Sequence, residues 1–375
     1  MFRCDMSGSA IHCARRAYIS TPTLYSGSVT RIKLTDVARE AGVHPSTASR
    51  ALNPLTRDKV GRQAARRVIQ AAERLGYVPN TLARGLRTAR SFVVAMIVPD
   101  VTNPLFPPMV RGAEQVLSSS GYTLVLTDTD NDAATERRHV QSMRGRGVDG
   151  FIVATARWHD DLLDELAASG VPAVLVNRRT ATNRLPYVGA DERAGIQLAV
   201  DHLVGLGHRN IAHLAGPADT STGRERADAF RQALAAHGLA VPARSMRVCS
   251  SYTEAAGLEM TRRLLASGTG GFTAIVAAND LIALGVLAAL NEKGLRCPAD
   301  VSLIGFNDLP LIDRLTPPMT TIRLPLHELG ELAAQTLLKQ MTNPHPAGAS
   351  VRTLLGIELV VRGTTAPASA VRRTG

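Results

Sequence analysis

Short apolar runs alternate with longer amphipathic segments through most of this chain. Nine such runs, from residues 92–98 to 321–323, are interleaved with eight segments of helical periodicity, from 107–119 to 326–340. Strands that alternate with helices predict parallel sheets covered by helices on both faces. A stretch of about 250 residues is long enough for two such lobes. We therefore expect a two-lobed α/β body over residues 91–362 and a frayed tail over 363–375.

A different pattern, all helical, precedes the body. Thr35 is the expected N-cap of a first short helix, Gly42 permits a sharp turn, and Pro45 suits the first position of a second helix. Two short helices joined by such a turn form a helix-turn-helix. A third helix is expected over residues 62–75. The apolar stripe of the first helix consists of Leu34, Val37, Ala38 and Ala41.

Nearly all of the excess positive charge lies in this helical head. The chain carries a formal net charge of +11, and residues 31–90 hold 13 Lys and Arg against 4 Asp and Glu. Residues 91–375 hold equal numbers of basic and acidic side chains. A basic head on a neutral body predicts that a polyanion is contacted by the head alone.

The remaining composition excludes several classes of protein. The chain has no apolar run of membrane-spanning length and no signal-peptide pattern, so we expect a cytoplasmic protein. None of the four cysteines forms a C-x-x-C pair, which favours free thiols. No zincin, hydrolase or P-loop motif occurs, so neither an enzyme nor a cofactor nor a metal is expected. Residues 1–30 are either a disordered leader or lie before the true start.

The head and the body together resemble the lactose-repressor (LacI/GalR) family of bacterial regulators. The motifs of the head are LTDVAREAGV, STASRALN, RVIQAAERLGYVPN and LARGLRT. Those of the body include VPDVTNPLFPPMVRGAE, PAVLVNR, HLVGLGHRNIAHLAGP, AANDLIALGVLAAL and DVSLIGFND, in the family's order. The resemblance covers about residues 32–362. It implies a DNA-binding domain at 31–78, a hinge helix and linker at 79–90, and an effector-binding body like periplasmic sugar-binding proteins.

The resemblance assigns DNA reading to the second helix of the head. The first residues of such a helix meet base edges in the major groove. Arg50 can donate two bonds to guanine, or alternatively contact a phosphate. His44 stands where relatives have a small capping residue, so we expect it to contact DNA instead, and Pro45 has no donor to offer a base. The expected DNA-contacting residues of the head are Thr35, His44, Pro45, Ser46, Thr47, Ser49, Arg50 and Asn53.

The hinge is expected to contact the minor groove. By resemblance, Leu86 is a wedge between base steps, which kinks DNA, and Asn80 and Ala83 line the groove beside it. The alternative is a plain linker helix with a buried leucine. Gly85 weakens the helix, so we expect the hinge to fold only on DNA.

A ligand site is expected where strands of the body end, because ligands of open α/β folds bind beyond the carboxyl ends of strands. By resemblance, Phe106 stacks on the effector, Arg226 clamps a hydroxyl or carboxylate, and Asn279 holds a hydroxyl. Asn177 and Asn307 stand where relatives often have Asp, which favours a less hydroxyl-rich or an anionic ligand. The expected effector-binding residues are Asn103, Leu105, Phe106, Asn177, Thr222, Arg226, Asn279 and Asn307.

Other roles stay open for several residues of the body. Asn177, Asp280 and Asp308 could cap helices, and Phe106 could belong to the core. Trp158, the one tryptophan, is expected in an exposed loop away from the ligand. Three histidines are expected apart from one another, at a helix end, a turn and a strand, which argues against a metal site. They are His202, His208 and His213.

Two functions from different classes remain. The favoured one is a repressor that binds a near-palindromic double-stranded operator as a homodimer, or possibly a tetramer, under the control of a carbohydrate-like effector. The expected dimer surface is residues 107–116 with 280–290 opposite. The alternative is a pure small-molecule binding protein without a regulatory role.

Overall fold

The computed structural model describes residues 32–53, 56–78, 90–240, 245–266, 271–343 and 351–368. The chain divides into two compact units, Met1–Pro79 and Asn80–Gly375, which we call the head and the body. The expected leader and the hinge residues Asn80, Ala83, Gly85 and Leu86 lie outside the described residues.

The head is a small helical cluster with a core of small side chains. Val37, Ala48, Ala51 and Val68 are fully buried, so short side chains let the helices approach closely. The predicted third helix is confirmed at its predicted bounds. The elements are α1 (Leu34–Glu40), α2 (Pro45–Leu52), the 3₁₀ turn η1 (Arg57–Lys59) and α3 (Arg62–Leu75).

The turn between α1 and α2 uses the expected glycine but not the expected cap. Gly42 has a φ of +63°, where a side chain would be strained. Thr35, predicted to be the N-cap of α1, lies inside the helix, and Lys33 is the N-cap. The Asp36 carboxylate accepts a hydrogen bond from the Lys33 N–H at 2.9 Å. The helix therefore begins two residues earlier than predicted, because Asp36 satisfies the N–H of the N-cap.

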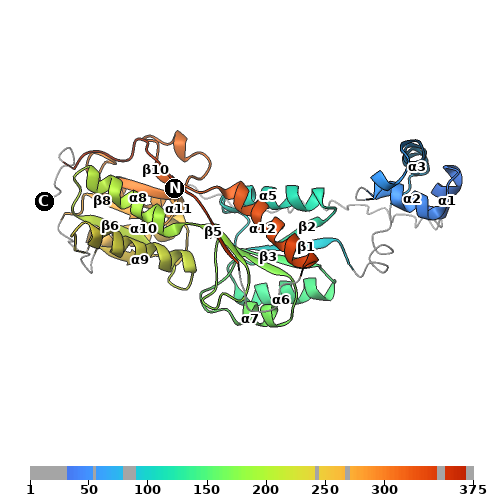
Figure 1. The fold of residues 1–375 in the computed structure, drawn as a ribbon. Helices are drawn as coiled ribbons and strands as arrows, with labels where there is room; N and C mark the ends of the chain where they lie inside the picture. The colour runs from blue at the N-terminus through green and yellow to red at the C-terminus, as the bar shows by residue number, and fades with distance from the viewer. Residues whose placement is uncertain are drawn as a thin grey trace, which may run out of the picture. The chain divides into compact units, whose positions relative to one another are not determined.

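The body contains two six-stranded sheets (Figure 1). Lobe 1 has the strand order β11-β5-β4-β3-β1-β2, and lobe 2 has the order β12-β10-β9-β8-β6-β7. All strand pairs are parallel except β10 with β12, which confirms the predicted α/β architecture. The strands are β1 (Val93–Val98), β2 (Thr123–Asp128), β3 (Gly150–Val153), β4 (Ala173–Val176), β5 (Tyr187–Ala190), β6 (Ile211–Ala215), β7 (Met246–Val248), β8 (Ala274–Ala277), β9 (Ser302–Asn307), β10 (Thr320–Arg323), β11 (Arg352–Leu355) and β12 (Glu358–Val360).

Helices cover both faces of each sheet. In Figure 1, α5 and α12 lie on one face of the lobe 1 sheet, and α6 and α7 lie on the other. Gly330 of α12 touches the backbone of Met109 in α5, where a Cβ would leave no space. The helices are α5 (Phe106–Ser119), α6 (Ala133–Gly145), α7 (Asp161–Ala168), α8 (Glu192–Gly205), α9 (Ser221–Ala236), α10 (Glu254–Ala266), α11 (Asp280–Glu292) and α12 (Leu326–Thr342), with a 3₁₀ turn η2 (Ile312–Arg314).

The central strands are buried on both faces, which explains their continuous apolar runs. Along β1, Val94 and Met96 pack in one core cluster, whereas Ala95 and Ile97 pack in the other. Side chains of a strand alternate between faces, so a sheet with helices on both sides needs apolar residues at every position.

Three short edge strands were not predicted from the sequence, whereas the longer edge strand β2 was. β7, β11 and β12 are half-exposed and carry polar side chains, so they lack an apolar run. β11 belongs to lobe 1 and β12 to lobe 2, so the described chain crosses between the lobes after β5, after β10 and after β11.

The expected frayed tail is wrong for residues 363–368. Thr364 is fully buried, and its hydroxyl accepts the Thr320 N–H at 2.8 Å and donates to the Leu303 carbonyl at 2.7 Å. Further along, the Ala368 N–H donates to the Leu206 carbonyl at 2.9 Å. These polar contacts, which leave no hydrophobic pattern in the sequence, attach the segment to lobe 2.

Candidate functional site

His44 caps the second helix of the head. Its Nδ1 accepts the Ser46 backbone N–H at 3.2 Å and lies 2.8 Å from the Ser46 hydroxyl. Pro45 occupies the first helical position as predicted. The expectation that His44 does not cap the helix is therefore wrong, because its side chain is the N-cap of α2. A ring nitrogen can replace a hydroxyl here because it has a lone pair in the plane of the ring.

The outer face of α2 is polar and exposed, opposite the buried Ala48 and Ala51. Arg50 is exposed, and its guanidinium takes part in no hydrogen bond or ion pair with the residues of the head that the structure describes. By contrast, the Arg57 Nε donates to the Ala51 carbonyl at 3.1 Å at the end of the same helix. Arg50 is thus available for an external acceptor, whereas Arg57 also holds the scaffold.

The other residues predicted to contact DNA surround this face. Ser46 and Thr35 are exposed, and Thr47 and Ser49 are half-buried. Asn53 is the C-cap of α2, where its N–H donates to the Arg50 carbonyl at 3.3 Å.

A narrow cavity opens in the body. All eight residues that the sequence predicted for effector binding line it, together with two more. The lining consists of Asn103, Leu105, Phe106, Asn177, Arg178, Thr222, Arg226, Tyr252, Asn279 and Asn307.

Both sheets contribute to the cavity at the carboxyl ends of their strands. From lobe 1, Asn103 and Phe106 follow β1, and Asn177 follows β4. From lobe 2, Asn279 follows β8 and Asn307 ends β9. Parallel strands present their carboxyl ends at one edge, which is why residues up to about 200 positions apart meet here.

Arg226 is held on the cavity wall by a buried ion pair. Its Nε donates to Glu192 Oε2 at 2.6 Å, and both side chains are at most 3% exposed. Its Nη1 donates to the Ala278 carbonyl. Burial alone would lower the pKa of Arg226, but the adjacent Glu192 carboxylate holds that pKa above its usual value. The guanidinium therefore remains charged beside the ligand space.

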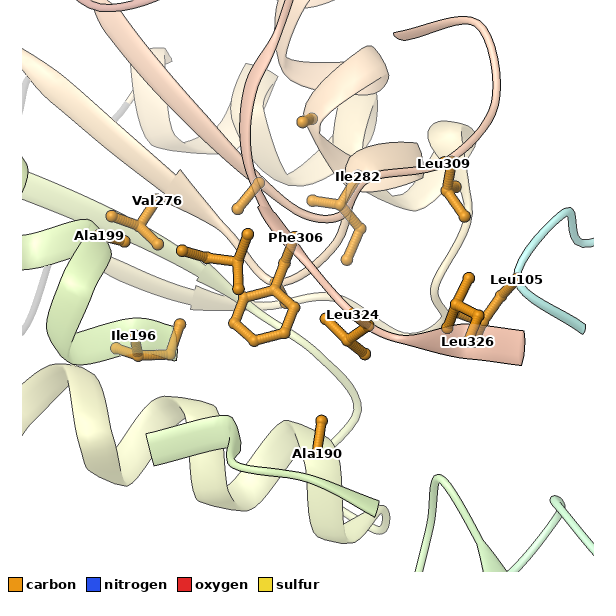
Figure 2. Packing of buried hydrophobic residues seen from close by; sticks show 14 of the residues in the cluster. Leu105, Ala190, Ile196, Ala199, Val276, Ile282, Phe306, Leu309, Leu324 and Leu326 are labelled. Carbon is orange, nitrogen blue, oxygen red and sulfur yellow. The ribbon is translucent and has the colours of Figure 1, made fainter. Parts of the chain in front are cut away.

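The Arg226 guanidinium packs against an aromatic ring of the hydrophobic core. The Arg226 guanidinium carbon lies 3.8 Å from the centroid of the Phe306 ring. Figure 2 shows the Phe306 ring among Ile196, Leu324 and neighbouring apolar side chains. Because these packed groups restrict the ring, they also fix the plane on which the guanidinium rests.

Amide side chains make up much of the polar lining. Asn279 is the N-cap of α11: its Oδ1 accepts the Ile282 N–H at 2.8 Å, and its Nδ2 donates to the Tyr252 carbonyl at 3.4 Å. Asn177 and Asn307 have φ angles of +65° and +121°, and Asn307 Oδ1 is buried without a hydrogen-bond partner among the described residues. Strained backbone of this kind is common at ligand sites.

The alternative roles left open for the acidic residues are not observed. Asp280 accepts the Leu309 N–H at 2.9 Å and the Thr321 hydroxyl at 2.6 Å, so it ties α11 to the segment after β9 and to strand β10. Asp308 pairs with Arg323 and Arg362 at 2.6 and 2.8 Å. Neither carboxylate caps a helix. Phe106 is 2% exposed, so it contributes to the core as well as to the cavity lining.

Tyr252 is a pocket residue that the sequence reasoning missed. Its hydroxyl lies 2.7 Å from the Thr222 hydroxyl and 3.2 Å from that of Thr220. Tyr252 follows β7, an edge strand without an apolar run, so no strand is predicted before it in the sequence. A search for every short strand, not only the apolar ones, would have identified it.

Trp158 is half-buried and connects the lobes, contrary to its expected position in an exposed loop. Its ring faces the guanidinium groups of Arg179 at 4.9 Å and Arg224 at 5.1 Å. The backbone N–H of Trp158 donates to the Asp219 carbonyl at 2.6 Å. Trp158 follows β3 of lobe 1, whereas Asp219 and Arg224 follow β6 of lobe 2, so these contacts bridge the two lobes.

The three histidines lie as predicted. His202 is in the last turn of α8, His208 follows that helix, and His213 is in β6. Among the residues that the structure describes, no group of three or more His, Cys, Asp or Glu could hold a metal ion. In the same described ranges, no helix is long and apolar enough to cross a membrane.

Comparison with known proteins agrees with this two-part architecture. Residues 33–80 match the model of bacterial regulatory proteins, lacI family, and residues 200–365 match that of a periplasmic binding protein-like domain. The HTH-type transcriptional regulator in the aml 5′ region of Streptomyces limosus is 35% identical over 93% of this chain and 98% of its own.

Two solved structures extend the comparison. The complex of the transcriptional regulator CelR with cellobiose is 30% identical, covering 89% of this chain and 100% of that one, with a TM-score of 0.68. The lac repressor dimer bound to operator and the anti-inducer ONPF is 27% identical, covering 89% and 99%, with a TM-score of 0.75. The predicted resemblance and fold class are confirmed. The chain therefore belongs to the lacI family of bacterial regulatory proteins and is a transcription regulator.

Proposed function

We propose that this regulator binds a near-palindromic operator as a homodimer and that a sugar-like effector in the body cavity controls this binding. The observation that carries the proposal is the cavity itself, where residues from the strand ends of both lobes converge. A ligand that contacts both lobes binds one lobe arrangement better than another, and this difference in affinity is what shifts a conformational equilibrium.

DNA reading is assigned to the exposed face of α2. Ser46 and Arg50 are exposed on this face, and Arg50 has the donor geometry for guanine. Pro45 and the capping His44 leave the start of the helix with few donors, so the preferred half-site differs from that of a relative with a serine cap. Asn80, Ala83 and Leu86 are proposed to contact the minor groove, as the family resemblance implies.

The dimer is proposed to form through helices α5 and α11. Leu281, Leu284 and Leu287 on α11 are only half-buried within one chain, and Pro107 and Arg111 on α5 are exposed. Burial of half-exposed leucines against a second copy is favourable. The lac repressor structure similar to this chain is likewise a dimer on operator DNA.

The lining of the cavity favours a polar ligand. Amides supply both donors and acceptors, and Phe106 adds an aromatic face. The similar CelR structure holds cellobiose, which supports a carbohydrate-like effector here. We place the protein in the cytoplasm, where a bacterial regulator meets the chromosome, and we assign it no catalytic step.

Selection from a random duplex pool tests the DNA-binding part. The full-length protein should enrich a near-palindromic sequence. Arg50→Ala should relax selectivity at one base position per half-site and weaken operator binding by about 1–3 kcal/mol. Lys59→Ala, which removes an exposed cation without base-edge geometry, should weaken all DNA sequences uniformly and reduce the salt dependence. Failure to enrich any sequence, combined with ligand binding, would favour the pure binding-protein alternative.

A further inference from the structure

Arg178 is a buried cation without a counter-charge in contact. It follows β4, lines the cavity and is 8% exposed. Its Nε has no hydrogen-bond partner among the described residues, and its side chain takes part in none of the ion pairs found there. Its guanidinium lies over the Tyr252 ring, 5.5 Å from the centroid. Burial lowers the pKa of Arg178, as expected for a charge held away from water.

Other arginines of the body, unlike Arg178, are paired with a carboxylate. Arg226 is paired with Glu192 at 2.6 Å, and the next residue along the chain, Arg179, is paired with Glu225 at 2.5 Å. Arg362 is paired with Asp308 at 2.8 Å. The buried Arg226 and the half-buried Arg179 and Arg362 are thus each neutralised by a carboxylate within hydrogen-bond distance.

The nearest acidic residues do not neutralise Arg178. Asp219 and Glu136 act on it only at longer range. Glu136 is itself occupied, because it accepts the Thr155 hydroxyl and pairs with Arg157 at 3.3 Å. No residue of the cavity lining is acidic, and Glu192 behind the wall neutralises only Arg226. The ligand space therefore carries about one uncompensated positive charge.

We propose that the effector carries an oxyanion, a carboxylate or a phosphate on a polyhydroxyl frame, and that Arg178 binds it. This rests on the proposed function of the cavity. The planar guanidinium matches a carboxylate or phosphate with two parallel hydrogen bonds, and a desolvated site strengthens both. The unpartnered Asn307 Oδ1 is an acceptor, which suits a hydroxyl of the same ligand. Arg178 is thus the specificity residue that separates acidic from neutral sugars.

Two matched ligand series test this with the full-length protein. One series is D-glucose, D-gluconate and D-glucose 6-phosphate, and the other is D-ribose, D-ribonate and D-ribose 5-phosphate. Inorganic phosphate and acetate, against sodium chloride of equal ionic strength, report the anion site alone. Binding is measured by calorimetry and by the melting temperature. The variant is Arg178→Gln, and the control is Arg263→Gln, which removes an exposed guanidinium from α10 in lobe 2.

We expect an anionic member of one series to bind wild type at least tenfold more tightly than its neutral parent. Arg178→Gln should remove that preference and the stabilisation by inorganic anions, whereas Arg263→Gln should retain both. Comparison of the sugar acids with the sugar phosphates identifies whether a carboxylate or a phosphate is preferred. The variant should melt no lower than wild type without ligand, since it removes an unpaired buried charge.

The proposal is overturned if a neutral sugar binds as tightly as its anionic counterparts, or if Arg178→Gln keeps the anion preference. It is also overturned if no anion binds or stabilises wild type. A neutral sugar that changes operator affinity would overturn only the oxyanion assignment and leave the proposed function intact. A protein without any DNA sequence preference would instead overturn the proposed function.

Discussion

The Arg226 guanidinium and the Glu192 carboxylate form a buried ion pair in the wall of the cavity, with Nε 2.6 Å from Oε2. Each residue belongs to a different helix of lobe 2, α9 and α8. Arg226 lines the cavity, and Glu192, which does not line it, neutralises the charge of Arg226. Arg226 is therefore a cation neutralised by Glu192, whereas Arg178 has no carboxylate in contact among the described residues.

Removal of one member of this pair should destabilise the body strongly. Glu192→Gln leaves Arg226 buried without a counter-charge, so we expect a loss of about 3–5 kcal/mol in the free energy of unfolding. Urea denaturation measures it. The control is Glu259→Gln, which breaks an exposed pair with Arg263 and should cost about 0–1 kcal/mol. Equal losses in the two variants would contradict the role given to burial.

The stability of the body should fall in mild acid because of His213. Burial lowers the pKa of His213 to about 4, against an ordinary value of 6.5. Between these values the unfolded chain binds the proton and the folded chain does not, so stability is lost as the pH falls. The full effect is about 3 kcal/mol. His213→Gln should flatten the profile between pH 6.5 and 4.

Asp280 acts in the opposite direction over a similar range. Burial raises its pKa to about 6 from 3.8, so protonation stabilises the folded state as the pH falls towards 4. The His213 effect is therefore read from the difference between wild type and His213→Gln, in which Asp280 cancels. Parallel pH profiles for these two proteins would show that His213 does not titrate as described.

The histidine cap of α2 should be measurable by amide exchange in the full-length protein. His44→Ala removes the acceptor for the Ser46 N–H, and we expect that amide to exchange faster and α2 to lose about 1 kcal/mol. His44→Ser should restore protection, because a hydroxyl at the N-cap also accepts this N–H. If Ser46 exchanges at the same rate in wild type and His44→Ala, the ring does not cap the helix.

The sequence predicted the cavity well for a topological reason. Its eight expected residues follow strands with clear apolar runs, and parallel strands bring their carboxyl ends together. Tyr252 was missed because its strand is a polar edge strand, and Thr364 because hydrogen bonds rather than apolar contacts attach its segment. The His44 cap could not be anticipated, since histidine is an uncommon N-cap and only the ring's orientation reveals it.

Trp158 should report the contact between the lobes. It is the one tryptophan of the chain, and its ring lies against Arg224 of the opposite lobe. Loss of a cation–π contact, about 0.5–1 kcal/mol, should increase the exposure of the ring. We expect Arg224→Gln to shift the emission to longer wavelength and to increase acrylamide quenching, while Arg263→Gln changes neither. Identical spectra for all three proteins would contradict the bridge.

The central claim is that the cavity ligand controls operator affinity. The direct measurement is the operator Kd of the full-length protein, on the selected sequence, with and without the tightest ligand of the glucose and ribose series. We expect that ligand to change the Kd at least tenfold in wild type. Arg226→Lys, which keeps the charge but loses the fork geometry, should bind operator normally and respond much less. An operator Kd unchanged by every ligand that binds the cavity would contradict the account.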